Sequence, residues 1–263
     1  MSTYLHFRKY HGAGNDFIIF QQEPSLSLSS DDIRALCDRH FGIGADGLII
    51  IEASTKAAFK MTYYNADGFE GSMCGNGGRC AAAFAYSLGW IEKTADFEAY
   101  DGMHHVEIID DQQDHFQIRL GMSKVSTWHI ADNYILLNTG SPHYVCLVDD
   151  VKNTAVFERG KAIRYDGQIS TEGVNVNFVE LHGNSLNMRT YERGVEAETL
   201  ACGTGVTAAA IAASLWKGGD RFEVNMPGGR LEVAFNFTGT QFENIVLTGP
   251  VAFVFEGVVK IPK

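Results

Sequence analysis

The sequence predicts a mixed α/β protein, of the α+β type, that is built from two homologous domains. The main observation is a repeated pattern, Cys-Gly-x-Gly-x-x-x-Ala-Ala, found in "MCGNGGRCAAAFA" (residues 73–85) and, 128 positions later, in "ACGTGVTAAAIAA" (residues 201–213). Both copies predict a helix that begins with glycine and is rich in alanine. Short alternating apolar and polar runs, typical of strands, surround both of them.

The repeat extends beyond the cysteines. "MTYYNADG" precedes the first copy and "MRTYERG" the second, each with a polar residue (Asn65 or Glu192) before a glycine turn. Further upstream, "GAGNDFIIF" is matched by "NTGSPHYVCL", which places Asn15 59 positions before Cys74 and Ser141 61 positions before Cys202. We therefore expect a first domain over residues 1–125 and a second over residues 126–263.

In the first half, strands are expected at residues 5–12, 16–22, 47–53 and 58–65, the last ending in a turn. "SSDDIRALCDRHFG" predicts a helix with Ser30 as its N-cap and its aspartates at the positive end. The first cysteine helix ends at Gly89. "HHVEIIDDQQDHFQIRL" predicts a hairpin with a polar turn.

The second half repeats this order. Strands are expected at residues 133–140, 143–150, 174–181 and 186–194, with a helix over residues 151–163. The second cysteine helix ends at Gly218. The tail from residue 221 alternates apolar and polar residues and predicts three or four strands.

Composition and charge exclude several classes of function. The formal net charge is −11, which argues against a nucleic-acid partner and disfavours anionic membranes. The chain has neither an apolar run of signal-peptide length at its start nor about 20 consecutive apolar residues, so a cytoplasmic location is expected. No dinucleotide or phosphate-loop motif and no metal-ligand spacing occur, so neither a cofactor nor a metal is expected.

The five cysteines are too few and too widely spaced for a disulfide framework. We expect Cys37, Cys80 and Cys146 to be core residues. Cys74 and Cys202 stand at helix starts, where unpaired N–H groups and the helix dipole bind anions and lower a thiol pKa from about 8.5 toward 3.5–7.5. Two equivalent helix starts could lie on opposite sides of one bound molecule, which would allow a proton to leave one face of a carbon and return to the other.

The motifs "GAGNDF", "YNADG", "MCGNGGRC", "YERG" and "ACGTG", in this order, resemble those of the diaminopimelate epimerase family. The resemblance implies cofactor-independent interconversion of LL- and meso-diaminopimelate, in lysine biosynthesis, by two cysteines. It also implies a homodimer whose two domains are each a barrel-like mixed sheet around a central helix. The segment from about residue 251 to 263 is expected to pack on the first domain.

The resemblance carries over to this chain residue by residue. It gives Cys74 and Cys202 the acid and base roles, with His143 and Glu192 in support of catalysis. The implied substrate-binding residues are Asn15, Asn65, Gly75, Asn76, Asn175, Glu192, Arg193, Gly203 and Thr204. Ser141 departs from the family, which often has Asn there. On the sequence alone, Glu192 and Arg193 could equally be solvated turn residues, and His143 an ordinary strand residue.

Alternative functions remain open. One is a proline racemase-like or other amino-acid racemase or epimerase, although a proline racemase-like or hydroxyproline epimerase-like enzyme would carry His at the position of Asn76, so the asparagine argues against that family. A phenazine-biosynthesis-type isomerase would share the fold but lack the cysteine pair. A dithiol redox or anion-binding protein would have two thiols bonded at rest and no turnover of amino acids.

Overall fold

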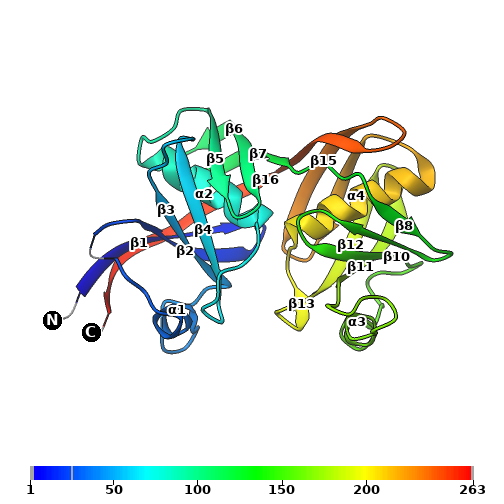
Figure 1. The fold of residues 1–263 in the computed structure, drawn as a ribbon, viewed down its shortest axis with the longest axis horizontal. Helices are drawn as coiled ribbons and strands as arrows, with labels where there is room; N and C mark the ends of the chain where they lie inside the picture. The colour runs from blue at the N-terminus through cyan, green and yellow to red at the C-terminus, as the bar shows by residue number, and fades with distance from the viewer. Residues whose placement is uncertain (1–2, 25, 262–263) are drawn as a thin grey trace. The chain divides into compact units, whose positions relative to one another are not determined.

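The computed structural model describes residues 3–24 and 26–261, which form two compact units. Unit 1 contains the described parts of Met1–Leu120 and Gly249–Lys263, and unit 2 contains Gly121–Thr248. The end of the chain thus belongs to the unit that contains its start. Each unit is a mixed sheet with a helix among its strands (Figure 1).

Unit 1 is an eight-stranded barrel. Its strands are paired in the order β1-β2-β3-β4-β5-β6-β7-β16, and β16 also pairs with β1, which closes the sheet. Two neighbouring pairs, β2–β3 and β4–β5, are parallel. The strands are β1 (Thr3–Gly12), β2 (Asn15–Gln21), β3 (Gly47–Glu52), β4 (Phe59–Asn65), β5 (Thr94–Ala99), β6 (Gly102–Gln112), β7 (His115–Met122) and β16 (Phe242–Ile261). The long strand β16 belongs to unit 2 up to Thr248 and to unit 1 from Gly249 onward.

Unit 2 repeats the arrangement. Its strands are paired in the order β8-β9-β10-β11-β12-β14-β15-β16, with β10–β11 and β12–β14 parallel. A bridge between Val125 and Phe242 joins the segment before β8 to β16. The remaining strands are β8 (Trp128–Ile130), β9 (Tyr134–Asn138), β10 (Pro142–Leu147), β11 (Asn175–His182), β12 (Ser185–Glu192), β13 (Ala197–Thr199), which pairs with β12, β14 (Arg221–Met226) and β15 (Gly229–Phe237).

The strand registers agree with the sequence repeat. Gly47 on β3 pairs with Asn65 on β4. The pairing of Val176 with Tyr191 puts Asn175 at the level of Glu192 on the equivalent strands β11 and β12. Asn65 and Glu192 therefore occupy equivalent places, as the repeat predicts.

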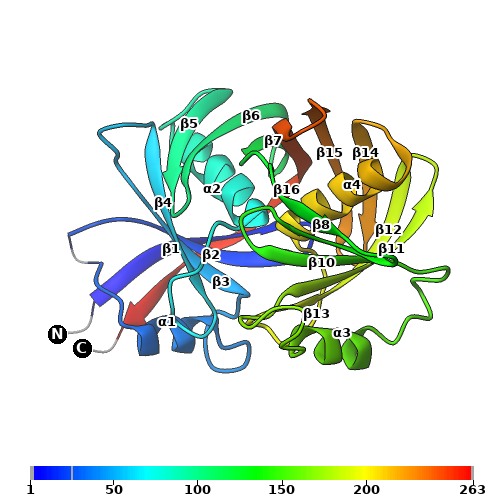
Figure 2. The same cartoon turned by 45° about the vertical axis from the view of Figure 1, so that its right-hand side comes forward.

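The cysteine motifs form the inner helices α2 (Gly75–Ser87) and α4 (Gly203–Lys217). Gly75–Ala85 and Gly203–Ala213 are buried throughout, and the helices contact strands on several sides of their own sheets. The alanines and glycines suit this setting because small side chains let a helix fit among strands. Figure 2 shows α4 among the strands of unit 2, with α3 (Val156–Arg164) outside them.

The helix ends show the expected glycines and two corrections. After α2, Gly89 has a φ of +71°, and the N–H groups of Gly89 and Trp90 bond to Tyr86 and Ala85, a Schellman ending. The N-cap of α1 (Ser30–Cys37) is Ser29, not Ser30, because Ser29 forms a capping box with Asp32. The expected helix over residues 151–163 begins only at Val156, since residues 151–153 form a bend and turn.

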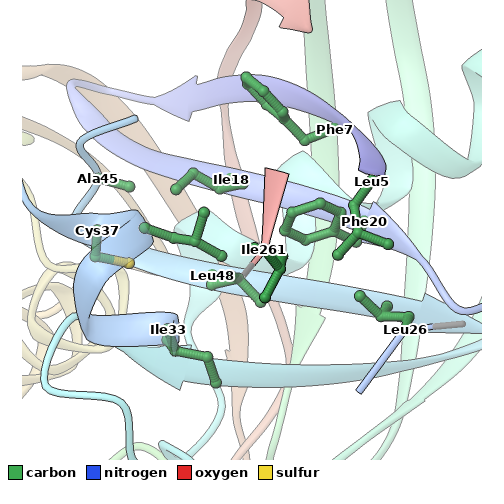
Figure 3. Packing of buried hydrophobic residues seen from close by; sticks show 11 residues of the cluster. Leu5, Phe7, Ile18, Phe20, Leu26, Ile33, Cys37, Ala45, Leu48 and Ile261 are labelled. Atoms are coloured by element: carbon green, nitrogen blue, oxygen red, sulfur yellow. The ribbon is translucent and has the colours of Figure 1, made fainter. Parts of the chain in front are cut away.

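Helix α1 covers the outer face of the unit 1 barrel. Its Ile33, Leu36 and Cys37 pack with apolar side chains of β1, β2 and β3, among them Ile18 and Leu48 (Figure 3). This outer layer is separate from the inner helix, so the barrel is packed from both sides. Within the described residues, no helix is long and apolar enough to cross a membrane.

Candidate active site

Each inner helix begins directly after a cysteine. Cys74 and Cys202 are the N-caps of α2 and α4, with extended backbone angles. Neither first turn, both lying within the described residues, contains Asp or Glu. The positive end of each helix dipole is therefore available for a thiolate or a substrate carboxylate.

In unit 1, the structure brings Cys74, Asn76 and Asn15 together. The Gly77 N–H donates to Cys74 Sγ over 3.4 Å, and Cys74 Sγ lies 3.8 Å from Asn15 Oδ1. Asn76 Nδ2 donates to the same Asn15 oxygen over 3.1 Å. Cys74 is partly exposed, and its sulfur lies beside the Gly77 N–H of α2 and the side-chain amide of Asn15 on β2.

Asn15 is held by a cluster of charged residues behind it. Its Nδ2 donates to Asp46 over 2.8 Å, and Arg39 bridges Asp46 and Asp16. Lys9, almost fully buried, pairs with Asp16 over 2.8 Å. Burial alone would raise the pKa of Asp16, but the hydrogen bonds and charges of Arg39 and Lys9 outweigh burial and lower it to about 2.

Asn65 lies in the same unit, at the end of β4. Tyr63 donates to its side-chain oxygen over 2.9 Å. Its backbone N–H bonds to Phe69 across the "NADG" turn. The turn that the sequence predicts here therefore positions Asn65 at a strand end.

In unit 2, the structure brings Cys202, Thr204 and His143 together. Cys202 Sγ lies 3.6 Å from Thr204 Oγ1, which lies 3.0 Å from His143 Nε2. Asn177 Nδ2 is 3.1 Å from His143 Nδ1, while Asn177 Oδ1 accepts from Thr190. Because this amide donates to Nδ1, the imidazole proton is on Nε2 and points at Thr204. The Thr204 hydroxyl can then donate to the sulfur.

His143 is completely buried. Burial, with a smaller contribution from the positive charge of Arg193, lowers its pKa to about 3. The ring is therefore neutral at physiological pH, and it acts on Thr204 as a hydrogen-bond donor rather than as a cation.

This neutral ring predicts a pH dependence of stability. In the unfolded chain His143 binds a proton near pH 6.5, but in the folded protein it does so only near pH 3. Between these two pH values, the free energy of unfolding therefore falls by about 1.4 kcal/mol for each pH unit of acidification. We expect the stability advantage of wild type over His143→Gln to shrink by about 2 kcal/mol between pH 7 and pH 5. Urea unfolding of both proteins at the two pH values measures it, and an advantage that does not change with pH would contradict a buried neutral ring.

The side chain of Asn175 forms hydrogen bonds with the segments before β10 and after β12 in unit 2. Its Nδ2 donates to Ser141 Oγ over 2.8 Å, and its Oδ1 accepts the Arg193 N–H over 2.9 Å. Glu192 accepts the Thr199 hydroxyl over 2.5 Å. Ser141, which departs from the family pattern, is thus a partner of a predicted substrate-binding residue.

The other three cysteines are core residues, as predicted. Cys37, Cys80 and Cys146 are buried. Burial raises the pKa of Cys37 to about 12 and that of Cys146 to about 11, and it also raises the pKa of Cys80. These thiols are protonated and unreactive at neutral pH.

The sequence interpretation missed two buried polar residues in these surroundings, Asn177 and Arg79. Asn177 lies two residues after Asn175 on β11, and this spacing, which puts both side chains on one face of a strand, could have revealed it. Arg79 is the one charged residue in "GNGGRCAAAFA". Among the described residues, no group of three or more His, Cys, Asp or Glu is arranged to hold a metal ion.

Comparisons with known proteins agree with the motifs. The sequence model of the family described as diaminopimelate epimerase matches residues 7–128 and 135–254. A diaminopimelate epimerase of Flavobacterium psychrophilum is 47% identical over 253 residues, which cover 94% of this chain and 97% of that protein. One of Chlorobaculum tepidum is 40% identical, with 95% and 99% covered.

Solved structures at low identity share the fold. A phenazine biosynthesis protein of the PhzF family from Bacillus anthracis superposes with a TM-score of 0.77 at 13% identity and covers 98% of this chain and 100% of that one. A hydroxyproline epimerase from Agrobacterium vitis gives 0.73 at 13% identity, with 99% and 93% covered. The fold is thus common to several enzymes, whereas the sequence matches over nearly the whole length show that this chain belongs to the diaminopimelate epimerase family of isomerases.

Proposed function

We propose that this protein interconverts LL- and meso-diaminopimelate, with Cys74 and Cys202 as the two acid–base groups at one α-carbon. The observation that carries the proposal is the duplicated helix start. In each unit a cysteine caps an inner helix whose first turn offers N–H groups and no carboxylate. Membership of the family supplies the substrate class.

The proposed reaction is a balanced transfer of one proton. A cysteine thiolate takes the α-proton from one face of the substrate, and the other cysteine, as a thiol, gives its proton to the opposite face. The configuration inverts, and the two sulfurs exchange protonation states. In the reverse direction the roles of Cys74 and Cys202 are exchanged.

The carbanion formed between the two transfers needs stabilisation without a cofactor. We assign this to the first-turn groups of Gly75, Asn76, Gly203 and Thr204, whose N–H groups and dipoles would bind the carboxylate as it takes up negative charge. Asn15, Asn65, Asn175, Glu192 and Arg193 are proposed to bind the polar groups of the substrate. Support comes from the hydrogen bonds that link Asn15 to Asn76 and Asn175 to Arg193.

His143 is proposed to support catalysis through Thr204. A donor at Nε2 turns the Thr204 hydroxyl toward Cys202 Sγ, and a hydrogen bond donated to sulfur favours the thiolate. Glu192 is proposed as the second supporting residue.

The direct test is incubation of the purified protein with LL-diaminopimelate and no added cofactor, followed by chiral chromatography. Formation of the meso isomer, and of LL from meso, is expected. L-Proline and trans-4-hydroxy-L-proline serve as comparison substrates, because the alternative racemases act on them. Turnover of either imino acid without turnover of diaminopimelate would refute the proposal.

Cofactor independence gives a separate prediction. Full activity is expected after treatment with EDTA or hydroxylamine, since no metal or carbonyl cofactor takes part in the proposed chemistry. Iodoacetamide should abolish activity because it blocks the sulfurs. Residual activity is measured after each treatment and gel filtration, and loss of activity on chelation would contradict the mechanism.

We further propose a cytoplasmic homodimer. The apolar side chains of Tyr4, Val254, Phe255 and Val258, all on the paired strands β1 and β16, are between 44% and 66% exposed and would suit a covered surface. Sedimentation velocity determines the oligomeric state.

A further inference from the structure

Arg79 is a buried cation for which the described residues supply no counter-ion. It lies in the second turn of α2 and is completely inaccessible to solvent. One terminal nitrogen donates to Gly75 O over 3.3 Å and the other to Asn76 Oδ1 over 2.9 Å, while Nε has no hydrogen-bond partner in the part of the chain that the structure describes. Among the described residues, no carboxylate forms an ion pair with it.

Such an arrangement is costly for folding. Burial of a charge without a partner is unfavourable, and burial lowers the pKa of Arg79 to about 10, which still leaves it protonated at neutral pH. An orphaned buried donor in a native protein calls for an explanation other than stability.

The hydrogen bonds of Arg79 fix the orientation of the amides next to Cys74. A guanidinium can only donate, so Asn76 must turn Oδ1 toward Arg79 and Nδ2 toward Asn15. At the other end, the carboxylate of Asp46 can only accept, so Asn15 turns Nδ2 toward Asp46 and Oδ1 toward Asn76 and Cys74. The Arg79 cation and the Asp46 anion thus fix the direction of the hydrogen bonds that run from Arg79 through Asn76 and Asn15 to Asp46.

The other ionisable groups on the surrounding elements do not balance the charge of Arg79. Most of the acids and bases are paired with one another, and Asp110 on β6, which is in no such pair, is exposed to solvent. Burial lowers the pKa of His11 and so keeps it neutral, and burial raises the pKa of Cys80. The pairs are Lys9 with Asp16, Arg39 with Asp16 and Asp46, Lys60 with Glu52, His104 with Asp101, Arg8 with Glu256, Lys93 with Asp111, His105 with Asp96, and Arg119 with Glu107.

The second repeat shows that the fold itself does not require this cation. Thr207 occupies the equivalent position of α4, 128 residues later, and donates to Gly203 O over 3.0 Å. Thr207 is buried as completely as Arg79. An uncharged side chain therefore satisfies the same helix position in unit 2.

We propose that Arg79 is a positioning residue for Cys74: it fixes the Asn76 amide and supplies the buried positive charge that balances negative charge on the sulfur or on a carboxylate at the start of α2. The inference rests on the role proposed above for Cys74. It assigns no contact between Arg79 and the substrate.

The test compares Arg79→Met with Arg79→Lys, which keeps the charge, and with Cys80→Ala, a matched change in the next buried residue of the helix. The alkylation rate of Cys74 by iodoacetamide is measured against pH by peptide mass spectrometry, with Cys202 in the same molecules as the internal reference. Only the thiolate reacts, so the midpoint reports the thiol pKa.

For Arg79→Met we expect the Cys74 midpoint to rise by about one pH unit, and kcat/KM at neutral pH to fall about tenfold for both isomers. In Arg79→Lys, which keeps the charge, the midpoint of Cys74 alkylation should stay close to that of wild type. Cys202 and the Cys80→Ala protein should retain wild-type midpoints. If Arg79→Met does not fold, Arg79→Gln, which can donate to Asn76 without a charge, takes its place.

An unchanged Cys74 midpoint in a folded Arg79→Met or Arg79→Gln protein would overturn the inference, even if activity fell. Equal shifts at Cys74 and Cys202 would also overturn it, because they would report general loosening. If wild type fails to epimerise diaminopimelate, the proposed function fails, yet the alkylation result still decides whether Arg79 tunes Cys74.

Discussion

Replacement of Cys74 or Cys202 by alanine is expected to slow the inversion of diaminopimelate by at least about 10²–10⁴-fold in each single variant. Inversion needs one group to remove a proton and another to deliver one from the opposite side, so neither sulfur can substitute for the other. Because the two act as a unit, the double variant should lose little more than either single variant.

Exchange of the substrate α-hydrogen with solvent distinguishes the roles of the two sulfurs. Each isomer is incubated in D₂O with each variant, and inversion and α-deuterium incorporation are followed separately by NMR. A variant that keeps the base for one isomer can still exchange that isomer's α-hydrogen, because exchange needs one base only. Cys80→Ala and Cys146→Ala are matched controls in the two units and should behave as wild type. Inversion at nearly the wild-type rate by either catalytic variant would end the two-cysteine mechanism.

The sequence predicts the start of each inner helix because the residues that form it are close together in the chain. A cysteine before two closely spaced glycines and an alanine run specifies both a helix start and a helix that fits among strands. The equivalence of Asn65 and Glu192 could be predicted from aligned motifs, and the strand registers agree with it. The barrel-like shape of the two sheets was predicted from the family resemblance and not from the periodicity of the sequence.

What the sequence could not predict depends on contacts between distant segments. An arginine in a helix usually faces solvent, but Arg79 is buried because the strands of unit 1 surround its helix. Its partner Asn76 forms a hydrogen bond with Asn15, which is 61 positions away in the sequence. Asn177 stands in a strand, where polar residues usually face solvent, yet its side chain holds His143. The one-residue shift of the α1 cap to Ser29 is a smaller case, since adjacent serines offer the same cap chemistry.

A second large effect is expected at Gly205, in the first turn of α4. A Cβ at this position would lie 2.5 Å from Asn177 Oδ1, closer than packing allows, and would also make a tight contact of 3.2 Å with Cys202 Sγ. Asn177 cannot withdraw easily, because it is buried and bonded to His143 and Thr190. Gly205→Ala should therefore displace the sulfur or break the support of His143.

Gly77 is the equivalent residue of α2 and provides the matched control. Its Cβ would lie 3.2 Å from Ile49 Cδ1 and 3.4 Å from Cys74 Cβ, contacts that a small adjustment relieves. We expect Gly205→Ala to lower kcat/KM about 100-fold and the free energy of unfolding by about 1–3 kcal/mol. Gly77→Ala should change kcat/KM by less than about threefold, a small effect because only slight overpacking results. Steady-state kinetics with LL-diaminopimelate and urea unfolding measure both, and equal effects at the two glycines would show that the close approach of Asn177 to α4 does not control the position of Cys202.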